Sequence, residues 1–216
     1  MRRRTFDFLA TCIGAVLTVV LLVGGGLLLW GSNFANNNVH TQLSEQQITF
    51  PPASAFQNVK APAPGTFEEV TPSMIPSVSQ YAGQPLTTGA QAEVYANDFI
   101  GEHLKEIGQG KTYAYWSAQA MSLPAGSKAA LNASNTADTL FKGTTLRGLL
   151  LEAYGFSVMG NIAWYGALAC FILAGVFFIL TMLGFLHFRK EDEERELLGL
   201  PKTVSQPLQD KEPALV

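Results

Sequence analysis

The chain has 216 residues, of which 48% are hydrophobic and 14% are charged, and its formal net charge is −3. A typical soluble domain carries about 25% charged residues, so this shortage of charge favours a small domain with membrane anchors over one soluble domain. With 14 basic and 17 acidic residues, the chain has no basic excess to neutralise phosphates, which excludes a nucleic-acid-binding protein. The apolar content excludes a mainly disordered chain.

Two long uncharged runs predict transmembrane helices. They cover residues 8–30 and 162–186, and neither contains Asp, Glu, Lys or Arg. Each exceeds the roughly 20 residues that a helix needs to cross a hydrocarbon core. A cleaved signal peptide is the alternative for the first run, because Arg2, Arg3 and Arg4 precede it. The run is longer than a signal h-region and no good cleavage site follows it, so we favour an uncleaved signal anchor.

Lysines and arginines near the two runs predict the orientation. Within 20 residues of a run, seven lie on the terminal side of the two runs and two lie on the side of the intervening segment. The seven are Arg2, Arg3, Arg4, Arg189, Lys190, Arg195 and Lys202, and the two are Lys142 and Arg147. By the positive-inside rule, residues 1–7 and 187–216 are cytoplasmic and residues 31–161 are extracytoplasmic. We therefore expect a protein that crosses the plasma membrane twice and contacts the lipid bilayer.

Small residues recur on both predicted spans. Those that we expect to pack helices are Ala10, Gly14, Thr18 and Gly25 on the first span, and Gly166, Cys170 and Ala174 on the second. Small residues four apart let helix backbones approach closely. An antiparallel pair sets Gly24–Gly26 against Gly166–Cys170, which leaves the inner stripe of the first span without an evident match. We therefore expect that stripe to contact a membrane-protein partner or a second copy; the alternative is the ordinary glycine content of membrane helices.

The first part of the intervening segment is poor in regular structure. Residues 33–47 begin polar and then predict a short helix, and residues 48–50 are expected to be extended. Residues 51–86 form a Pro-rich loop that holds seven of the eleven prolines. Proline removes backbone donors and fixes φ, so we expect no regular helix there. The apolar residues of the loop, including Phe67, indicate that it packs against another part of the protein.

Residues 87–156 predict a small α-helical domain. Thr87 and Thr88 are candidate N-caps of a helix that ends at Gly108 and Gly110. Further helices are predicted at 112–123, at 127–142 and from Thr144–Thr145 onward, with Gly143 as the break between the last two. In the last helix several leucines crowd one side, and it either continues into the second span or lies on the membrane surface. The fold class is thus mainly α, with two transmembrane helices flanking a small helical extracytoplasmic domain.

A domain of this size holds little core of its own. We therefore expect it to rely on the outer ends of the spans, on the Pro-rich loop or on a partner. The cytoplasmic tail is expected to continue the second helix through its acidic run and to be disordered beyond Pro201.

No motif predicts catalysis, and we expect neither an enzyme nor a bound cofactor. The three histidines form no H-E-x-x-H pattern, and no G-x-S-x-G occurs. Asp98 and Glu102 are four residues apart and His103 is adjacent, which makes these three a weak candidate for a cation site. We favour the alternative, a solvated helix face. The spans contain no ionisable residue, which argues against a stand-alone transporter or channel.

Four stretches carry a resemblance to known sequences. They are WGSNFANNNVH at 30–40, LSEQQITFPP at 43–52, LTTGAQAEVYANDFIGEHL at 86–104 and GTTLRGLLLEAYGF at 143–156. They resemble a set of uncharacterised two-pass membrane proteins of actinobacteria. The resemblance implies a bacterial plasma membrane and a two-pass topology, and it implies no activity. The absence of cysteine from residues 31–161 also fits a bacterial cell surface.

Two functions of different classes follow from these features. The first is a non-enzymatic accessory or scaffold subunit of a larger envelope or respiratory complex. The second is an extracytoplasmic ligand sensor, which would signal through a partner because the short tail leaves no room for an output domain. An outer-leaflet enzyme that uses Asp98, Glu102 and His103 is a third and weaker alternative.

Overall fold

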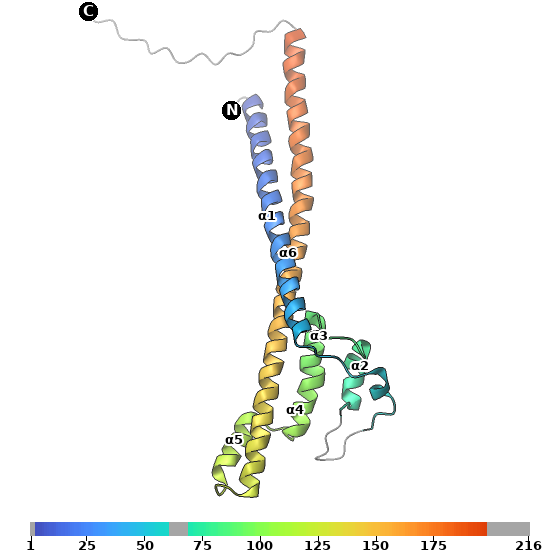
Figure 1. Cartoon of the computed structure of the whole chain (residues 1–216). Coiled ribbons are helices and arrows are strands. Elements are labelled where there is room, and N and C mark those ends of the chain that lie inside the picture. The colour runs from blue at the N-terminus through green and yellow to red at the C-terminus, as the bar shows by residue number, and fades with distance from the viewer. Residues whose placement is uncertain (1–2, 61–68, 198–216) are drawn as a thin grey trace, which may run out of the picture. The chain divides into compact units, whose positions relative to one another are not determined.

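The computed structural model describes residues 3–60 and 69–197, and within these ranges it is helical, with a single antiparallel bridge and no named strand (Figure 1). It contains two compact units, and each is described by itself. The first consists of Met1–Leu27 with Ala167–Val216, and the second of Leu28–Gly166. The long helices α1 (Arg3–Glu45) and α6 (Lys128–Leu197) contribute to both units. The prediction of a mainly α-helical chain is confirmed; the tail beyond residue 197 lies outside the described residues.

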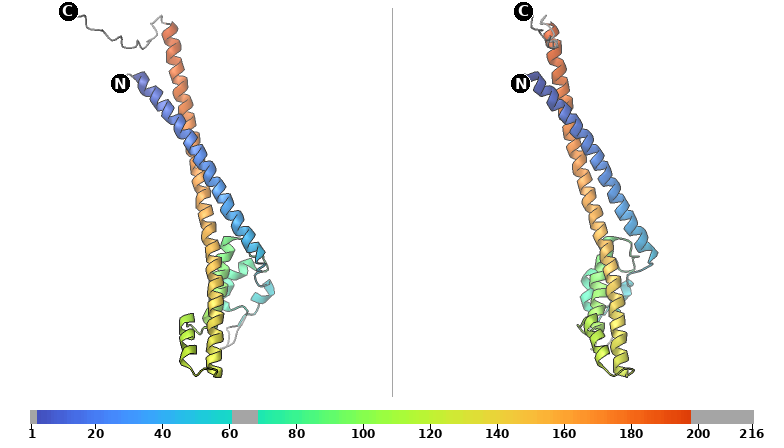
Figure 2. Two further views of the ribbon diagram at one scale, coloured as in Figure 1. Left: turned by 60° about the vertical axis from the view of Figure 1, so that its left-hand side comes forward. Right: turned by 90° about the vertical axis from the view of Figure 1, so that its left-hand side faces the viewer.

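Both long helices contain a segment that is long and apolar enough to cross a membrane. In the most apolar window of 18 residues, 11% is buried in α1 and 6% in α6. The core helix of a soluble protein would be mostly buried, so these two helices fit a two-pass membrane protein. In all views each helix runs without a break (Figures 1 and 2).

Helices α1 and α6 extend further than the sequence predicts. The separate helix expected at 33–47 is instead the last part of α1, which ends at Glu45. The break expected at Gly143 is wrong, because Gly143 lies inside α6. A Cβ at that position would lie 2.5 Å from Cδ2 of Leu104, so the glycine makes room for the leucine of another helix. Of the two alternatives for the last predicted helix, continuity with the second span is the one observed.

The Pro-rich segment contains short turns rather than a structureless loop. They are the 3₁₀ turns η1 (Ala53–Phe56), η2 (Pro72–Met74) and η3 (Ser79–Tyr81), and one α-turn, α2 (Ile75–Val78). The expectation of no regular helix is therefore wrong for α2. Pro76 lies in its first turn, where the missing N–H has no intrahelical partner to lose.

The two ends of the Pro-rich segment are held together by backbone hydrogen bonds. The N–H of Phe50 donates to the carbonyl of Gln84 at 3.0 Å, and the N–H of Leu86 donates to the carbonyl of Ile48 at 2.8 Å. Residues 48–50 are extended here, as predicted. Thr49, in their middle, pairs with Pro85 in an isolated antiparallel bridge. Phe67 and the rest of 61–68 lie outside the described residues.

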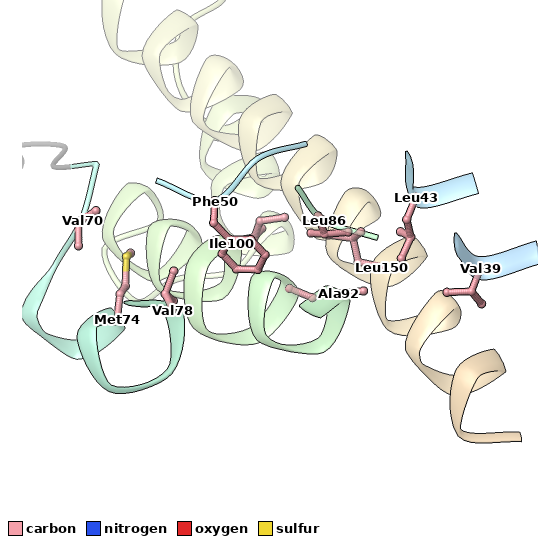
Figure 3. Close-up of a cluster of buried hydrophobic side chains, with 11 residues drawn as sticks. Val39, Leu43, Phe50, Val70, Met74, Val78, Leu86, Ala92, Ile100 and Leu150 are labelled. Carbon is pink, nitrogen blue, oxygen red and sulfur yellow. The ribbon is translucent and has the colours of Figure 1, made fainter. Parts of the chain in front are cut away.

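The core of the second unit is assembled from short pieces that are far apart in the sequence (Figure 3). Its buried members are Val39, Leu43, Phe50, Val70, Met74, Val78, Leu86, Ala92, Ala96, Ile100 and Leu150. Val39 and Leu43 belong to α1, Leu150 belongs to α6, and four members come from the Pro-rich segment. The domain thus depends for its core on the long helices and on the Pro-rich segment, as its small size predicts.

The helix that was predicted to follow Thr88 is present and has three consecutive parts. They are α3 (Gly89–Val94), the π-helical segment η4 (Tyr95–Ile100) and α4 (Gly101–Ile107). Thr88 begins it with a capping box: the N–H of Gln91 donates to Oγ1 of Thr88 at 3.3 Å, and the N–H of Thr88 donates to Oε1 of Gln91 at 3.1 Å. Helix α5 (Tyr113–Ser122) follows, and Nε1 of Trp116 donates to the carbonyl of Gly108 at 2.9 Å.

We expect Thr88→Ala to weaken the first turn of α3 by about 1 kcal/mol, because the N–H of Gln91 loses its acceptor. Amide hydrogen exchange of Gln91 in the full chain should then be about fivefold faster. Thr144→Ala is the matched control, since Thr144 is an exposed residue inside α6 rather than a cap. If Thr88→Ala and Thr144→Ala change the amide exchange of Gln91 equally, Thr88 does not cap the helix.

Candidate functional site

In the first unit, α1 and α6 face each other through glycine and threonine. A Cβ on Gly14 would lie 2.6 Å from Oγ1 of Thr181, and one on Gly184 would lie 2.8 Å from Oγ1 of Thr11. A Cβ on Gly25 would lie 3.2 Å from Cβ of Cys170. In these three facing pairs, the residue number on α6 falls by as much as the number on α1 rises. This is the register of a closely packed antiparallel helix pair.

The other residues of the expected packing set have different positions. Thr18 is buried, and its Oγ1 donates to the carbonyl of Gly14 at 2.8 Å. Ala174 is buried as well, whereas Ala10 is exposed. Gly166 belongs to the second unit, where a Cβ would lie 3.3 Å from Cδ1 of Leu28.

The expectation that the inner stripe lacks a match within the chain is wrong. Gly14 meets Thr181, and Thr11 meets Gly184, so the counterpart of the stripe is a threonine and a glycine three residues apart on α6. A search for small residues spaced by four does not find this pair. Gly14 therefore contacts the chain's own α6, whereas Ala10 of the same stripe is exposed.

We expect Gly14→Ala to destabilise the helix pair by about 1–3 kcal/mol, because the new methyl group overlaps Oγ1 of a β-branched side chain with few rotamers. The thermal midpoint of helix loss, followed by circular dichroism of the full chain in mild detergent, should fall. Gly24→Ala is the matched control, because a Cβ there meets nothing within 4 Å.

Adding Thr181→Ala to Gly14→Ala should restore most of the lost stability, since it removes the overlapping oxygen. If the double variant loses as much stability as the two single variants lose in sum, the contact between Gly14 and Thr181 is not the cause of the loss.

The candidate cation residues are engaged in contacts within the protein. Glu102 forms an ion pair with Lys105, and its Oε2 accepts a hydrogen bond from Oγ of Ser73 at 3.3 Å. His103 is buried, and its Nε2 donates to the backbone carbonyl of Glu69 at 3.1 Å. Asp98 is partly exposed. In the part of the chain that the structure describes, no group of three His, Cys, Asp or Glu side chains is placed to hold a metal.

The π-helical segment η4 explains why a spacing of four misleads here. Asp98 lies inside η4, and Glu102 follows it in α4. A π-helical turn contains more residues than an α-helical turn, so residues four apart across this segment are not stacked as they are in an α-helix. The sequence carries no evident signal of the π turn.

The phenol of Tyr95 is partly buried, and its pKa is shifted. Burial, and secondarily the nearby charge of Glu69, raises the pKa of Tyr95 above its ordinary value of 10.0. Its ring packs edge-on against Phe50 at a centroid distance of 5.2 Å, and it packs at a tilt of 33° against Phe99 at 4.7 Å. Because the folded state favours the protonated phenol, its contribution to stability is present below pH 10.0 and is lost as the pH rises through the raised pKa.

We expect Tyr95→Phe to retain stability near neutral pH, since the ring contacts remain, and to reduce the loss of stability above about pH 10. Thermal midpoints of the full chain at about pH 8 and about pH 11 test this. Tyr113 is exposed, so Tyr113→Phe should show the same fall of the thermal midpoint at high pH as the unmodified chain. Identical pH profiles of Tyr95→Phe and the unmodified chain would contradict the assignment.

The second unit has an open groove between α1 and α6, which we call the outer groove. Its volume is about 520 Å³. It is lined by Phe34, Asn38, Val39, Gln42, Leu43, Gln46, Leu146, Leu149, Leu150, Glu152, Ala153 and Phe156. Four large apolar side chains on it are exposed: Leu149 is 59% exposed, Phe34 55%, Phe156 44% and Leu146 38%.

The sequence pattern indicates the outer groove only in part. The leucines near residue 150 predict an apolar helix side, but Leu150 enters the core whereas Leu149 stays exposed. Phe34 precedes a run of three asparagines, so the sequence pattern indicates a polar stretch there. Phe34 lines the groove because α1 continues through this stretch to Glu45. No protein-family model, curated protein or solved structure matches the chain.

Proposed function

We propose that this chain is a non-enzymatic two-pass plasma-membrane protein that serves as an accessory or scaffold subunit of a larger envelope or respiratory complex. In this proposal both termini are cytoplasmic and residues 31–161 are extracytoplasmic, in a bacterial membrane. The observation that carries it is the outer groove, with Leu149, Phe34 and Phe156 exposed on its surface. Burial of such side chains against a partner is the main source of affinity at protein interfaces.

The way in which the second unit is built supports a docking role. Val39 and Leu43 of α1 and Leu150 of α6 are part of its buried core, so the surface of the outer groove is supported by packed side chains. Arg147 of α6 donates from Nη2 to Oδ1 of Asn97 at 2.9 Å, which ties α6 to η4 as well. A rigid surface loses little conformational entropy when a partner binds.

A ligand sensor is the second candidate, and the same groove supports it. Its volume lies within the range of about 300–1,000 Å³ that small-molecule sites have. The lining combines apolar side chains with a few polar groups, among them Asn38 and Gln42, as such sites do. In this second candidate a signal passes from the groove to a partner protein.

To test the proposal, the full chain is affinity-purified from its native membranes in mild detergent and its partners are quantified by mass spectrometry. We expect a stoichiometric envelope protein, and we expect Leu149→Glu to reduce it by at least about tenfold, because a charge enters the apolar contact. Leu131→Glu is the matched control: Leu131 also lies on α6 and is 57% exposed, but it does not line the groove.

Two outcomes would contradict the accessory role. One is a chain that purifies without any other protein. The other is a chain that gains thermal stability from a small apolar ligand and loses this gain with Leu149→Glu, which would favour the sensor.

A further inference from the structure

A polar cleft lies between α5 and the beginning of α6, which run side by side (Figures 1 and 2). We call it the amide cleft, and its volume is about 650 Å³. Its described lining residues are Gln109, Trp116, Gln119, Leu123, Ala129, Asn132, Ala133, Asn135 and Thr136. Four of these side chains are amides, one is an indole, and none is charged. We propose that the amide cleft binds an uncharged saccharide.

The indole of Trp116 is a fixed and partly exposed surface in the amide cleft. Its Nε1 donates to the carbonyl of Gly108 at 2.9 Å, so the N–H needs no partner from a ligand. The ring also packs edge-on against Tyr115 at a centroid distance of 5.5 Å. These two contacts hold the ring in place for stacking. The negative face of an aromatic ring attracts the weakly positive C–H groups on one face of a sugar ring.

The amides of the cleft are available to a ligand. Within the described part of the chain, no hydrogen bond engages the side chains of Gln109, Gln119, Asn132 and Asn135. Gln119 is half-buried, so water reaches its amide less freely than it reaches the others. An amide offers donors and an acceptor side by side, and a sugar hydroxyl can donate and accept as well. Amides beside an aromatic ring can therefore pair with neighbouring hydroxyls of one stacked sugar.

The backbone at Gln109 supports a role for its side chain. Gln109 has a φ of 51°, in the left-handed region, where glycine is the unstrained residue. Gly108 and Gly110 stand on either side of it. The turn between α4 and α5 nevertheless has an amide at its central position, and this amide lines the cleft. Strained residues of this kind are concentrated at ligand sites.

The chemistry of the lining argues against other classes of ligand. An anion needs basic side chains and a hard metal ion needs carboxylates, and neither is among the described lining residues. An apolar ligand would cover the amides without pairing them. An extended peptide points successive N–H and C=O pairs to opposite sides, so only every second residue can pair with one wall. Hydrolysis of a saccharide needs two carboxyl groups, so the lining fits binding rather than cleavage.

The position of the cleft along α6 fits a saccharide of the envelope. Asn132 lies 30 residues before Ile162, the first residue of the second predicted span, on the same uninterrupted helix. At 1.5 Å per residue, about 45 Å of helix separates the cleft from the span. This step rests on the proposed function, which places residues 31–161 outside the cytoplasm. On that topology α6 holds the cleft away from the lipid, on the side where a bacterial envelope carries its polysaccharides.

Binding is measured with the full chain in phosphatidylcholine nanodiscs, because a glycoside detergent would itself compete for a saccharide site. The chain has three tryptophans, so Trp30→Phe and Trp164→Phe leave Trp116 as the only one. Chitotetraose and maltotetraose are the two uncharged probes. We expect at least one of them to change the emission of Trp116 saturably, with a Kd of about 1 mM or below. If neither binds at about 10 mM, the proposal is wrong.

Removal of single amides tests whether the cleft is the binding site. Gln119→Ala and Asn135→Ala should each weaken binding by at least about fivefold, because a hydrogen bond to the ligand is lost. Asn161→Ala is the matched control, since Asn161 is an exposed amide on α6 that does not line the cleft. Circular dichroism should show the same helix content for all three variants. Equal binding by the three variants would overturn the proposal.

A neutral peptide and the purification of partners complete the test. Binding of pentaglycine without binding of either saccharide would assign the cleft to a protein segment and overturn the proposal. The purified chain binds a saccharide without any other protein, so the accessory role is tested separately. Loss of the saccharide leaves that role standing. A chain that binds a saccharide but purifies without another protein supports the amide cleft and contradicts only the accessory role.

Discussion

In the first unit, α1 and α6 come so close at two glycines that there is no room for a Cβ. Gly14 meets the hydroxyl of Thr181, and Gly184 meets the hydroxyl of Thr11. Where lipid surrounds two helices, burial of apolar surface does not drive their association, so packing at short range has to do so. Large side chains remain on the outside, including Val16 and Ile172, which are 62% and 60% exposed. The division between small residues inside and large residues outside defines the helix pair.

The same use of glycine organises the second unit. A Cβ on Gly89 would lie 2.3 Å from Cβ of Ser157, which brings the start of α3 against α6. Gly143 accommodates Leu104 of α4 in the same way. Because the buried apolar residues come from short separate segments, such close contacts hold the segments on α6. A helix that looks interrupted in the sequence is therefore the continuous support of the domain.

Periodicity and charge were sufficient to predict the mainly helical fold, the two apolar helices and the cap at Thr88. They did not predict where the long helices begin and end, because Gly143 and the asparagines after Trp30 are unfavourable in an isolated helix but tolerated in a packed one. The spacing-based cation candidate is not assembled, since Glu102 pairs with Lys105 and the π turn changes the register. The groove depends on which of two adjacent leucines is buried, and periodicity over a crowded helix side does not decide this.

Glycine has two different environments along α6. At Gly143 and Gly184 another side chain occupies the space that a Cβ would need, so the loss of helix propensity is offset by a contact. At Gly148 and Gly155 no atom of residues 3–60 or 69–197 lies within 4 Å of an added Cβ, so no such contact offsets the loss there. Glycine is common in transmembrane helices, but these two positions lie beside the outer groove and outside the predicted spans. A neighbouring side chain therefore requires glycine at Gly143 and Gly184, whereas none does so at Gly148 and Gly155 in the part of the chain that the structure describes.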